Sequence, residues 1–236
     1  MKLKRPFQNQ MTKIQTVLGW IYLPLHAVAL PVLISLYAGV ASGMTEGKAN
    51  LLYYGIGVCF VVAVMLSYLR RSFDVLLDNF RLCLMCIALA LLVDYAMSAV
   101  AALLLLLVEI IPDNPNDNAV MEAVAQSYGV MKGLIIFIGP IVEEILFRGV
   151  VFGSIRARSR GWAYVVSVGL FSIYHVWQYA IVSGDPRMLF YAIQYIPVSI
   201  ALAWAYERSG NIWTTIFFHM GFNAVSFLAM SIMERM

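Results

Sequence analysis

Charged residues are scarce in this 236-residue chain. Asp, Glu, Lys and Arg together make up 12% of it, whereas hydrophobic residues make up 62%, and the mean hydropathy is +0.81. A soluble globular domain has about 25% charged and about 45–50% apolar residues, so the composition excludes an ordinary soluble domain. The apolar residues also form runs of roughly 18 residues or more, which is long enough to cross the hydrocarbon core of a bilayer. The composition therefore predicts an integral membrane protein.

Cysteines and basic clusters are also few. The chain has three cysteines, and two of them, Cys83 and Cys86, lie in a run of Leu, Met and Ile. A redox or zinc role requires a polar, accessible setting, so we interpret both as small apolar packing residues. The net charge of +3 is small, and no basic patch is interleaved with aromatic residues. We therefore expect no nucleic-acid partner.

Seven apolar segments are candidates for membrane-spanning helices. We expect an all-α, polytopic transmembrane helical bundle of about seven to eight spans, seven of which are identified at 17–41, 51–69, 82–111, 131–153, 162–182, 188–205 and 212–232. The third is long for one crossing, so it must tilt, bend or extend past the membrane. Residues 72–81 could lie flat on the membrane surface. Residues 112–118 predict a turn-rich loop, and residues 119–129 a short interfacial helix.

The basic residues predict the orientation of the chain. The apolar run after the basic N-terminus is too long for a signal peptide and has no small-residue cleavage site, so it is interpreted as a retained first span. Cytoplasmic loops carry an excess of Lys and Arg. On one side of the membrane the sequence places Lys2, Lys4, Arg5, Lys13, Arg70, Arg71, Arg81, Arg156, Arg158, Arg160 and Arg208. The other side has Lys48, Lys132, Arg187 and Arg235. The N-terminus is thus expected in the cytoplasm and, with seven spans, the C-terminus outside.

Several ionisable residues lie inside the predicted spans, where a charge is costly and its default interpretation is functional. Glu143, Glu144 and Arg148 form the pattern E-E-x-x-x-R in the fourth span. Residues i and i+4 share a helix face, whereas i and i+1 point about 100° apart, so Arg148 reaches Glu144 better than Glu143. We expect a structural ion pair between Glu144 and Arg148 that leaves Glu143 facing another direction. Pro140 removes one helix hydrogen bond nearby and can open room for water.

Two histidines and an asparagine complete this polar set. His175 follows Phe171 by one helical turn in the fifth span, and His219 and Asn223 form the pattern H-x-x-x-N in the seventh. Each alone is more often a helix–helix hydrogen bond than a catalyst. Measured from the cytoplasmic ends of their spans, however, Glu143, His175 and His219 lie about 20, 20 and 14 Å along their helices. Such similar depths predict that the three side chains share one site, near the midplane or on its cytoplasmic side.

These residues suggest a family. The ordered set E-E-x-x-x-R, F-x-x-x-H and H-x-x-x-N on successive apolar helices resembles the CPBP family, the CAAX-processing and bacteriocin-processing intramembrane proteases also called Abi or Rce1-type proteins. The stretch S-G-N-I-W-T-T-I-F-F-H-M-G-F-N is similar to the family's third motif, in which a Gly and a Trp precede the His. The resemblance covers about residues 131–236 and implies a catalytic helical core there. Residues 1–130 would then supply N-terminal transmembrane helices and amphipathic connectors.

The resemblance also implies roles for individual residues. The implied catalytic set is Glu143, Glu144, His175, His219 and Asn223. Within it, Glu143 would act on water with help from His175, whereas His219 and Asn223 would stabilise the oxyanion. Glu144 would shape the site, with structural support from Arg148 and Phe171.

The chemistry of the set permits two mechanisms. Glu143, His175 and His219 could hold a divalent metal such as zinc, with a water in the fourth position. Without a metal, Glu143 can act as a general base while His219 and Asn223 donate to the developing oxyanion. The sequence leaves both mechanisms open. Asp94 and His26 lie outside the motifs. Asp94 could face the cavity or pair with His26, and we expect a structural role for both residues.

The predicted function is therefore that of an intramembrane endopeptidase that hydrolyses a peptide bond of a membrane-associated peptide or protein. A proton-coupled membrane transporter could also use Glu, His and Asp, but the sequence lacks a matching pair of broken helices. A non-catalytic membrane scaffold or immunity protein is a third alternative, against which the intact polar set argues. We expect a prokaryotic plasma-membrane protein whose partners are the lipid bilayer and a peptide or protein substrate, and the oligomeric state stays open.

Access to the site is predicted from the need for water. Hydrocarbon supplies no water, so a hydrolytic site inside the membrane must have a wet path. The loop with Arg156, Arg158 and Arg160 is basic, whereas the opposite ends of spans four and five carry few polar groups. The cavity is accordingly expected to open to the cytoplasmic face, next to this loop.

Overall fold

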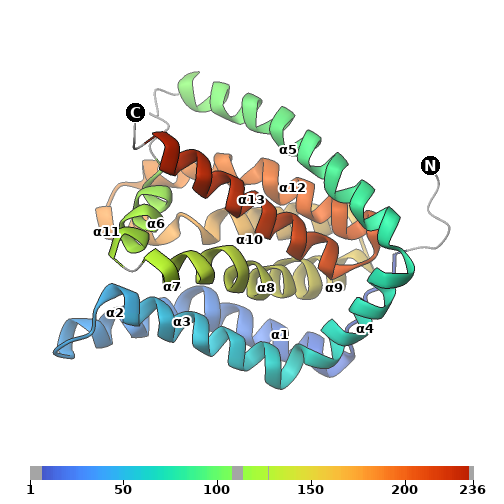
Figure 1. The fold of residues 1–236 in the computed structure, drawn as a ribbon, viewed down its shortest axis with the longest axis horizontal. Coiled ribbons are helices and arrows are strands. Elements are labelled where there is room, and N and C mark those ends of the chain that lie inside the picture. The colour runs from blue at the N-terminus through green and yellow to red at the C-terminus, as the bar shows by residue number, and fades with distance from the viewer. Residues whose placement is uncertain (1–6, 108–113, 127, 234–236) are drawn as a thin grey trace.

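The computed structural model describes residues 7–107, 114–126 and 128–233, and in these ranges the chain is helical and has no β-strand (Figure 1). The prediction of an all-α bundle is confirmed. The N-terminal part forms three long helical rods. They consist of α1 (Lys13–Pro24), η1 (Leu25–Ala29) and α2 (Leu30–Val40), then α3 (Glu46–Phe60), η2 (Val61–Met65) and α4 (Leu66–Asp78), and finally α5 (Phe80–Leu107).

The C-terminal part surrounds a central rod that combines α-helical and π-helical stretches. The short helix α6 (Pro115–Gln126) precedes this rod, which contains α7 (Tyr128–Gly133), η3 (Leu134–Ile138), α8 (Gly139–Glu144), η4 (Ile145–Phe152) and α9 (Gly153–Arg156). The remaining helices are α10 (Arg160–Tyr174), α11 (Trp177–Ser183), η5 (Pro186–Tyr191), α12 (Ala192–Ser209) and α13 (Ile212–Met233). The π-helical stretch η3 ends directly before α8, which has Pro140 in its first turn, as expected where proline removes a helix hydrogen bond.

Local sequence signals explain where several helices begin and end. Thr12 caps α1 and forms a capping box with Gln15, whose amide also donates to the Val64 carbonyl and so joins the first two rods. Gly184 and Gly210 have positive φ angles of 65° and end α11 and α12. Only glycine adopts this left-handed conformation without a steric penalty, so both chain reversals depend on it.

The central rod lies between the other helices. Figure 1 shows α8 and α9 between the N-terminal helices and α13, and η4 contacts α1, α10, α12 and α13. All eight residues of η4 are buried. The helix α5 packs on α12 and α13 and leaves many of its leucines exposed, as a helix that faces lipid does.

The described residues include five helical segments that are long and apolar enough to cross a membrane, or six if the bent pair α10 and α11 counts as one. This supports a polytopic membrane protein, although the number is lower than the predicted seven to eight. The predicted fourth span, 131–153, is helical but does not qualify by composition, because Glu143, Glu144 and Arg148 lie within it.

Two smaller expectations have a different outcome in the structure. Residues 72–81 could lie flat on the membrane surface, whereas residues 72–78 continue the second rod as the end of α4, with Ser72 and Leu76 buried. Asp94 could face the cavity or pair with His26, but it does not line the cavity, Ser98 donates to it, and His26 bonds instead with the Tyr53 hydroxyl. Both residues are buried.

Candidate active site

The central rod holds a fully buried ion pair. Arg148 Nη1 lies 3.1 Å from Glu144 Oε1, and neither side chain is exposed. Arg148 Nη2 donates to the Ser199 hydroxyl at 2.9 Å, and the guanidinium lies over the Phe171 ring at 4.1 Å from its centre. The predicted pairing of Arg148 with Glu144 is confirmed. The contribution of Ser199 was not foreseen, although a serine in an apolar helix is a signal for such a bond.

The ion pair also orients His219. His219 Nδ1 lies 2.8 Å from Glu144 Oε1, the same oxygen that accepts from Arg148. Because Glu144 is paired with a cation, its carboxylate is the acceptor and His219 Nδ1 carries the proton. Glu144 therefore fixes the plane of the imidazole ring and directs Nε2 away from the ion pair.

His175 is held in a similar manner. It follows the last residue of α10, and its Nδ1 lies 2.8 Å from the Phe171 carbonyl oxygen. A carbonyl only accepts, so Nδ1 carries the proton and Nε2 points away from the helix. The ring stacks on Tyr195 at 4.3 Å and packs against Phe171 at 4.5 Å. Phe171 thus supports both Arg148 and His175, consistent with its predicted structural role.

Glu143 lies between the two imidazole rings. Its Oε2 is 3.8 Å from His175 Nε2 and 3.9 Å from His219 Nε2. These distances are too long for direct hydrogen bonds and leave room for a bridging water. The sequence prediction that Glu143 faces another direction from Glu144 agrees with this geometry, as does the convergence of Glu143, His175 and His219.

The side chains around Glu143 are of the kinds that bind metal ions. Two imidazole Nε2 atoms and one carboxylate, each imidazole fixed by an outer hydrogen bond, match the kinds of ligand that zinc uses in hydrolases. Within the part of the chain that the structure describes, however, no group of three or more His, Cys, Asp or Glu side chains is arranged to hold a metal ion. The residues match a metal in kind, whereas their spacing matches a bridging water better.

Asn223 lies on the same cavity but has a different partner. Its side-chain amide donates to the Ile135 carbonyl oxygen at 3.0 Å, in the π-helical stretch before Pro140. One of its two N–H groups is therefore used to join α13 to the central rod. The other amide hydrogen is the one that a ligand could accept.

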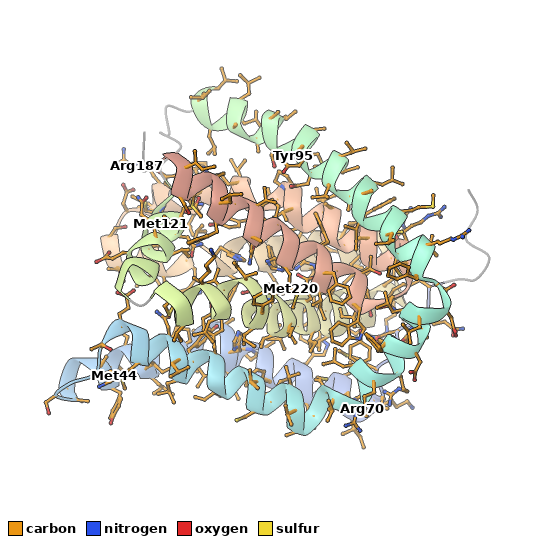
Figure 2. The ribbon with its side chains drawn as sticks, in the orientation of Figure 1. Met44, Arg70, Tyr95, Met121, Arg187 and Met220 are labelled. Carbon is orange, nitrogen blue, oxygen red and sulfur yellow. The ribbon has the colours of Figure 1, made fainter. Side chains whose placement is uncertain are left out.

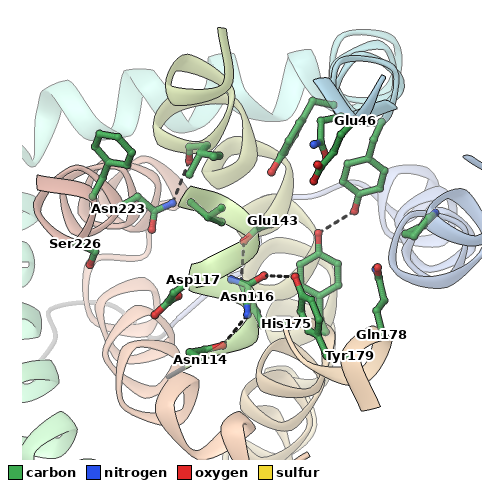
Figure 3. Close-up of a pocket in the computed structure, with 18 of the residues that line it drawn as sticks. Glu46, Asn114, Asn116, Asp117, Glu143, His175, Gln178, Tyr179, Asn223 and Ser226 are labelled. Atoms are coloured by element: carbon green, nitrogen blue, oxygen red, sulfur yellow. Dashed lines mark hydrogen bonds and ion pairs between the residues drawn. The ribbon is translucent and has the colours of Figure 1, made fainter. Parts of the chain in front are cut away.

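A cavity of about 910 Å³ contains these groups. Figure 3 shows Glu143, His175 and Asn223 directed into it, and Asn114, Asn116, Asp117, Gln178 and Tyr179 also line it. Asn114 donates to Gln194 at 2.6 Å and to the Tyr195 hydroxyl at 2.8 Å, so the polar wall is itself hydrogen-bonded. Polar groups therefore line one part of the cavity, and apolar side chains such as Ile34 and Met230 line the rest.

The mouth lies at the end of the bundle opposite to the predicted one. Met44 and Thr45 line the cavity, and Figure 2 shows Met44 at the end where α6 and α11 lie, far from Arg70 and the α9 end. No residue of the Arg156–Arg160 loop lines it. The prediction of access beside that loop is wrong. It took the far ends of spans four and five to be poor in polar groups, whereas the chain bends by 44° after α10 and brings polar residues of α6, α11 and α12 around the site.

Comparison with known proteins supports this interpretation of the motifs. Residues 126–225 match the family described as type II CAAX prenyl endopeptidase Rce1-like. Over this segment, which is less than half of the chain, the sequence is similar to that family. The segment contains Glu143, Glu144, Arg148 and the motif residues of α10 and α13, so the resemblance inferred from the motifs is confirmed.

A bacterial relative points in the same direction. The protein named "Putative membrane peptidase YdiL" from Bacillus subtilis (strain 168) is 28% identical over 112 residues, which is 47% of this chain and 41% of the relative. The match thus spans less than half of that relative's length. No solved structure matches the chain at a significant level.

The first prediction concerns the buried ion pair. Replacing Arg148 by Met keeps most of the side-chain volume but removes the charge that compensates Glu144. Because a buried charge without its partner is strongly destabilising, the Arg148→Met variant should lose about 3–5 kcal/mol of stability. The measurement is thermal unfolding in detergent together with membrane abundance. The control is Arg158→Met in an exposed loop, and equal stability of the two variants would contradict a structural role for the pair.

The second prediction concerns the direction of the mouth. If the basic end of the bundle faces the cytoplasm, residues at the opposite end face outward. In a variant without the three native cysteines, Asn118→Cys in α6 should react in intact cells with a membrane-impermeant thiol reagent. Arg158→Cys, at the basic end, should react only after the membrane is opened. The reverse pattern would place the mouth in the cytoplasm.

Proposed function

We propose that this Rce1-like chain is an intramembrane peptidase that hydrolyses a peptide bond of a membrane-associated peptide or protein. The observation that carries this proposal is the position of Glu143, whose carboxylate faces the Nε2 atoms of His175 and His219 at 3.8 and 3.9 Å. A carboxylate and two imidazoles around space for one water form a site for activating that water. The family match and the named relative support a peptidase as the kind of enzyme.

In the proposed reaction Glu143 is the general base. It takes a proton from the water while the water oxygen attacks the carbonyl carbon of the peptide bond and forms a tetrahedral intermediate. The same proton is then given to the leaving nitrogen as the carbon–nitrogen bond breaks, which yields a carboxylic acid and an amine. The second hydrogen of the water is donated to Nε2 of either His175 or His219, which fixes the direction of attack.

The oxyanion of the intermediate requires hydrogen-bond donors. The second amide hydrogen of Asn223 can serve as one, because its first is held by the Ile135 carbonyl. His219 can donate through Nε2 only when that nitrogen carries a second proton, since its Nδ1 proton is directed to Glu144. The proposed role of Glu144 is therefore to position His219, with Arg148 holding Glu144 in place.

The shape of the cavity supports an extended peptide segment as the substrate. A volume of about 910 Å³ is large enough for several residues. Tyrosines and side-chain amides line it between the mouth and Glu143, so backbone N–H and C=O groups of a bound peptide would find partners. A divalent metal at the Glu143, His175 and His219 side chains, if bound, would supply a Lewis acid for the same water.

The third prediction tests the general base. The Glu143→Gln variant keeps the shape of the side chain but cannot accept the proton, so peptide cleavage in membranes should fall by at least about 100-fold. Abundance should stay close to that of the wild type, because Glu143 is not part of the ion pair. The matched control is Glu122→Gln, the same change at an exposed residue of α6 that does not line the cavity.

Two outcomes of this assay would change the proposal. Full cleavage by Glu143→Gln would remove this residue as the base. Loss of cleavage on treatment of the wild type with a chelator, with recovery on addition of zinc, would show that the water is activated by a metal.

A further inference from the structure

A second cavity lies at the basic end of the bundle. It has a volume of about 530 Å³ and is formed by the start of α5, the end of α12 and the segment that joins α9 to α10. Three arginines line it: Arg156, Arg160 and Arg208. No residue of this cavity belongs to the site around Glu143.

One carboxylate organises two of these arginines. Glu207 Oε1 accepts from Arg156 Nε at 2.6 Å, and its Oε2 accepts from Arg160 Nη2 at 2.9 Å. The Tyr164 hydroxyl also donates to Oε2 at 2.9 Å. Glu207 is only 6% exposed, so the arginines are anchored from the protein side. Arg156 and Arg160 share this one carboxylate, so this group of side chains carries a net positive charge.

The opposite wall of this cavity is apolar and faces lipid. Met85 and Leu89 lie one turn apart on α5 and are 51% and 46% exposed. Trp204 of α12 also lines the cavity, and tryptophan is enriched at the level where the membrane meets water. The cavity thus joins a basic end to an apolar, lipid-facing wall at the boundary of the bilayer.

We propose that this cavity binds an anionic phospholipid, with the phosphate of the headgroup at the arginines and an acyl chain along Met85 and Leu89. The charge favours a phosphate, because arginine recognises phosphate oxygens through paired N–H groups. The apolar wall favours a lipid over free inorganic phosphate, since only a lipid covers Met85 and Leu89. Basic pockets between membrane helices on the cytoplasmic side are a known setting for such headgroups.

The test uses the fluorescence of Trp204 in the purified full chain. Phospholipids with brominated acyl chains quench a tryptophan that they contact, and the signal of Trp204 is the difference between wild type and Trp204→Phe. Brominated phosphatidylglycerol should quench Trp204 at about fivefold lower mole fraction than brominated phosphatidylcholine. This is the factor expected when at least one arginine interacts with the negative charge of the headgroup. Arg208→Gln should remove this preference, and Arg158→Gln should retain it, because Arg158 has the same charge but does not line the cavity.

Each other result would overturn the proposal. Equal quenching by both lipids would show that the cavity does not select an anionic headgroup. Loss of the preference in Arg158→Gln as well would assign it to the general charge of this end of the protein. Relief of quenching by millimolar inorganic phosphate, with no dependence on the acyl chain, would indicate a site for free phosphate.

A separate set of hydrogen bonds carries a second inference, which rests on the proposed function. His26 is 1% exposed, and its two ring nitrogens face two tyrosines. The Tyr22 hydroxyl lies 3.4 Å from Nδ1, and the Tyr53 hydroxyl lies 2.9 Å from Nε2. The Tyr53 hydroxyl also lies 2.8 Å from that of Tyr174, which directly precedes His175 and lines the cavity of Glu143.

The donor and acceptor of each hydrogen bond can be assigned one after another, from Tyr22 to Tyr174. If Tyr22 donates to Nδ1, the neutral imidazole carries its proton on Nε2 and donates it to the Tyr53 oxygen. The Tyr53 hydrogen is then free for the Tyr174 oxygen, and the Tyr174 hydrogen is left for an acceptor in the cavity. The His26 carbonyl oxygen, at 3.3 Å from the Tyr53 hydroxyl, competes for the Tyr53 hydrogen at a longer distance.

The geometry points to Tyr174 as a catalytic residue that donates a hydrogen bond to the oxyanion, with His26 and Tyr53 as positioning residues. This donor complements Asn223, one of whose amide hydrogens is held by Ile135. Tyr174→Phe should lower kcat by about 100-fold with little change in KM, because the bond forms mainly in the transition state. Affinity for a phosphinate peptide, which mimics the tetrahedral intermediate, should fall by a similar factor.

The control is Tyr206→Phe, which removes a hydroxyl from a buried tyrosine pair outside the cavity, where Tyr68 and Tyr206 lie 3.1 Å apart. Suppose that the wild type cleaves peptide and Glu143→Gln does not. An unchanged kcat in Tyr174→Phe would then overturn this inference alone. A fall in kcat in Tyr206→Phe equal to that in Tyr174→Phe would assign the effect to packing. Activity of Glu143→Gln would instead overturn the proposed function.

Discussion

The buried pair of Glu144 and Arg148 is the interaction on which the geometry of the site depends. Removing two charges from water is costly, and the cost is offset only when further hydrogen bonds complete the pair. Here the Arg148 guanidinium donates to Ser199 of α12 and lies over the ring of Phe171 in α10. The Glu144 carboxylate also accepts from His219 of α13. One ion pair therefore joins the central rod to three other helices.

This arrangement separates the two adjacent glutamates by function as well as by direction. Glu144 is enclosed and uses Oε1 for both Arg148 and His219. Glu143, one residue earlier, faces the cavity and makes only longer contacts with the two histidines. The carboxylate that holds the structure is thus distinct from the carboxylate that faces a ligand, and a change in one need not disturb the other. Helical geometry alone provides this separation, because neighbouring side chains point about 100° apart.

Sequence reasoning succeeded where local geometry governs the result. The pairing of Glu144 with Arg148 follows from their spacing of one turn, and the meeting of Glu143, His175 and His219 was predicted from their similar depths on three helices. It failed where the result depends on segments that approach only in the folded chain. The mouth of the cavity is built from Asn116, Gln178 and other residues of the short helices α6 and α11, which no span prediction places next to the site. No periodicity in the sequence reports the position of these helices.

The same reasoning explains why the helix that carries the site is the one whose composition is least typical of a membrane span. A helix in contact with lipid must be apolar, because hydrocarbon offers no partner to a charge. The stretch η4 contacts α1, α10, α12 and α13, and all of its residues are buried, so its polar groups meet protein instead of lipid. The apolar requirement falls on the outer helices, as the exposed leucines of α5 illustrate. A run that carries Glu and Arg at one-turn spacing between strongly apolar spans therefore indicates an enclosed helix, and with it the position of a site.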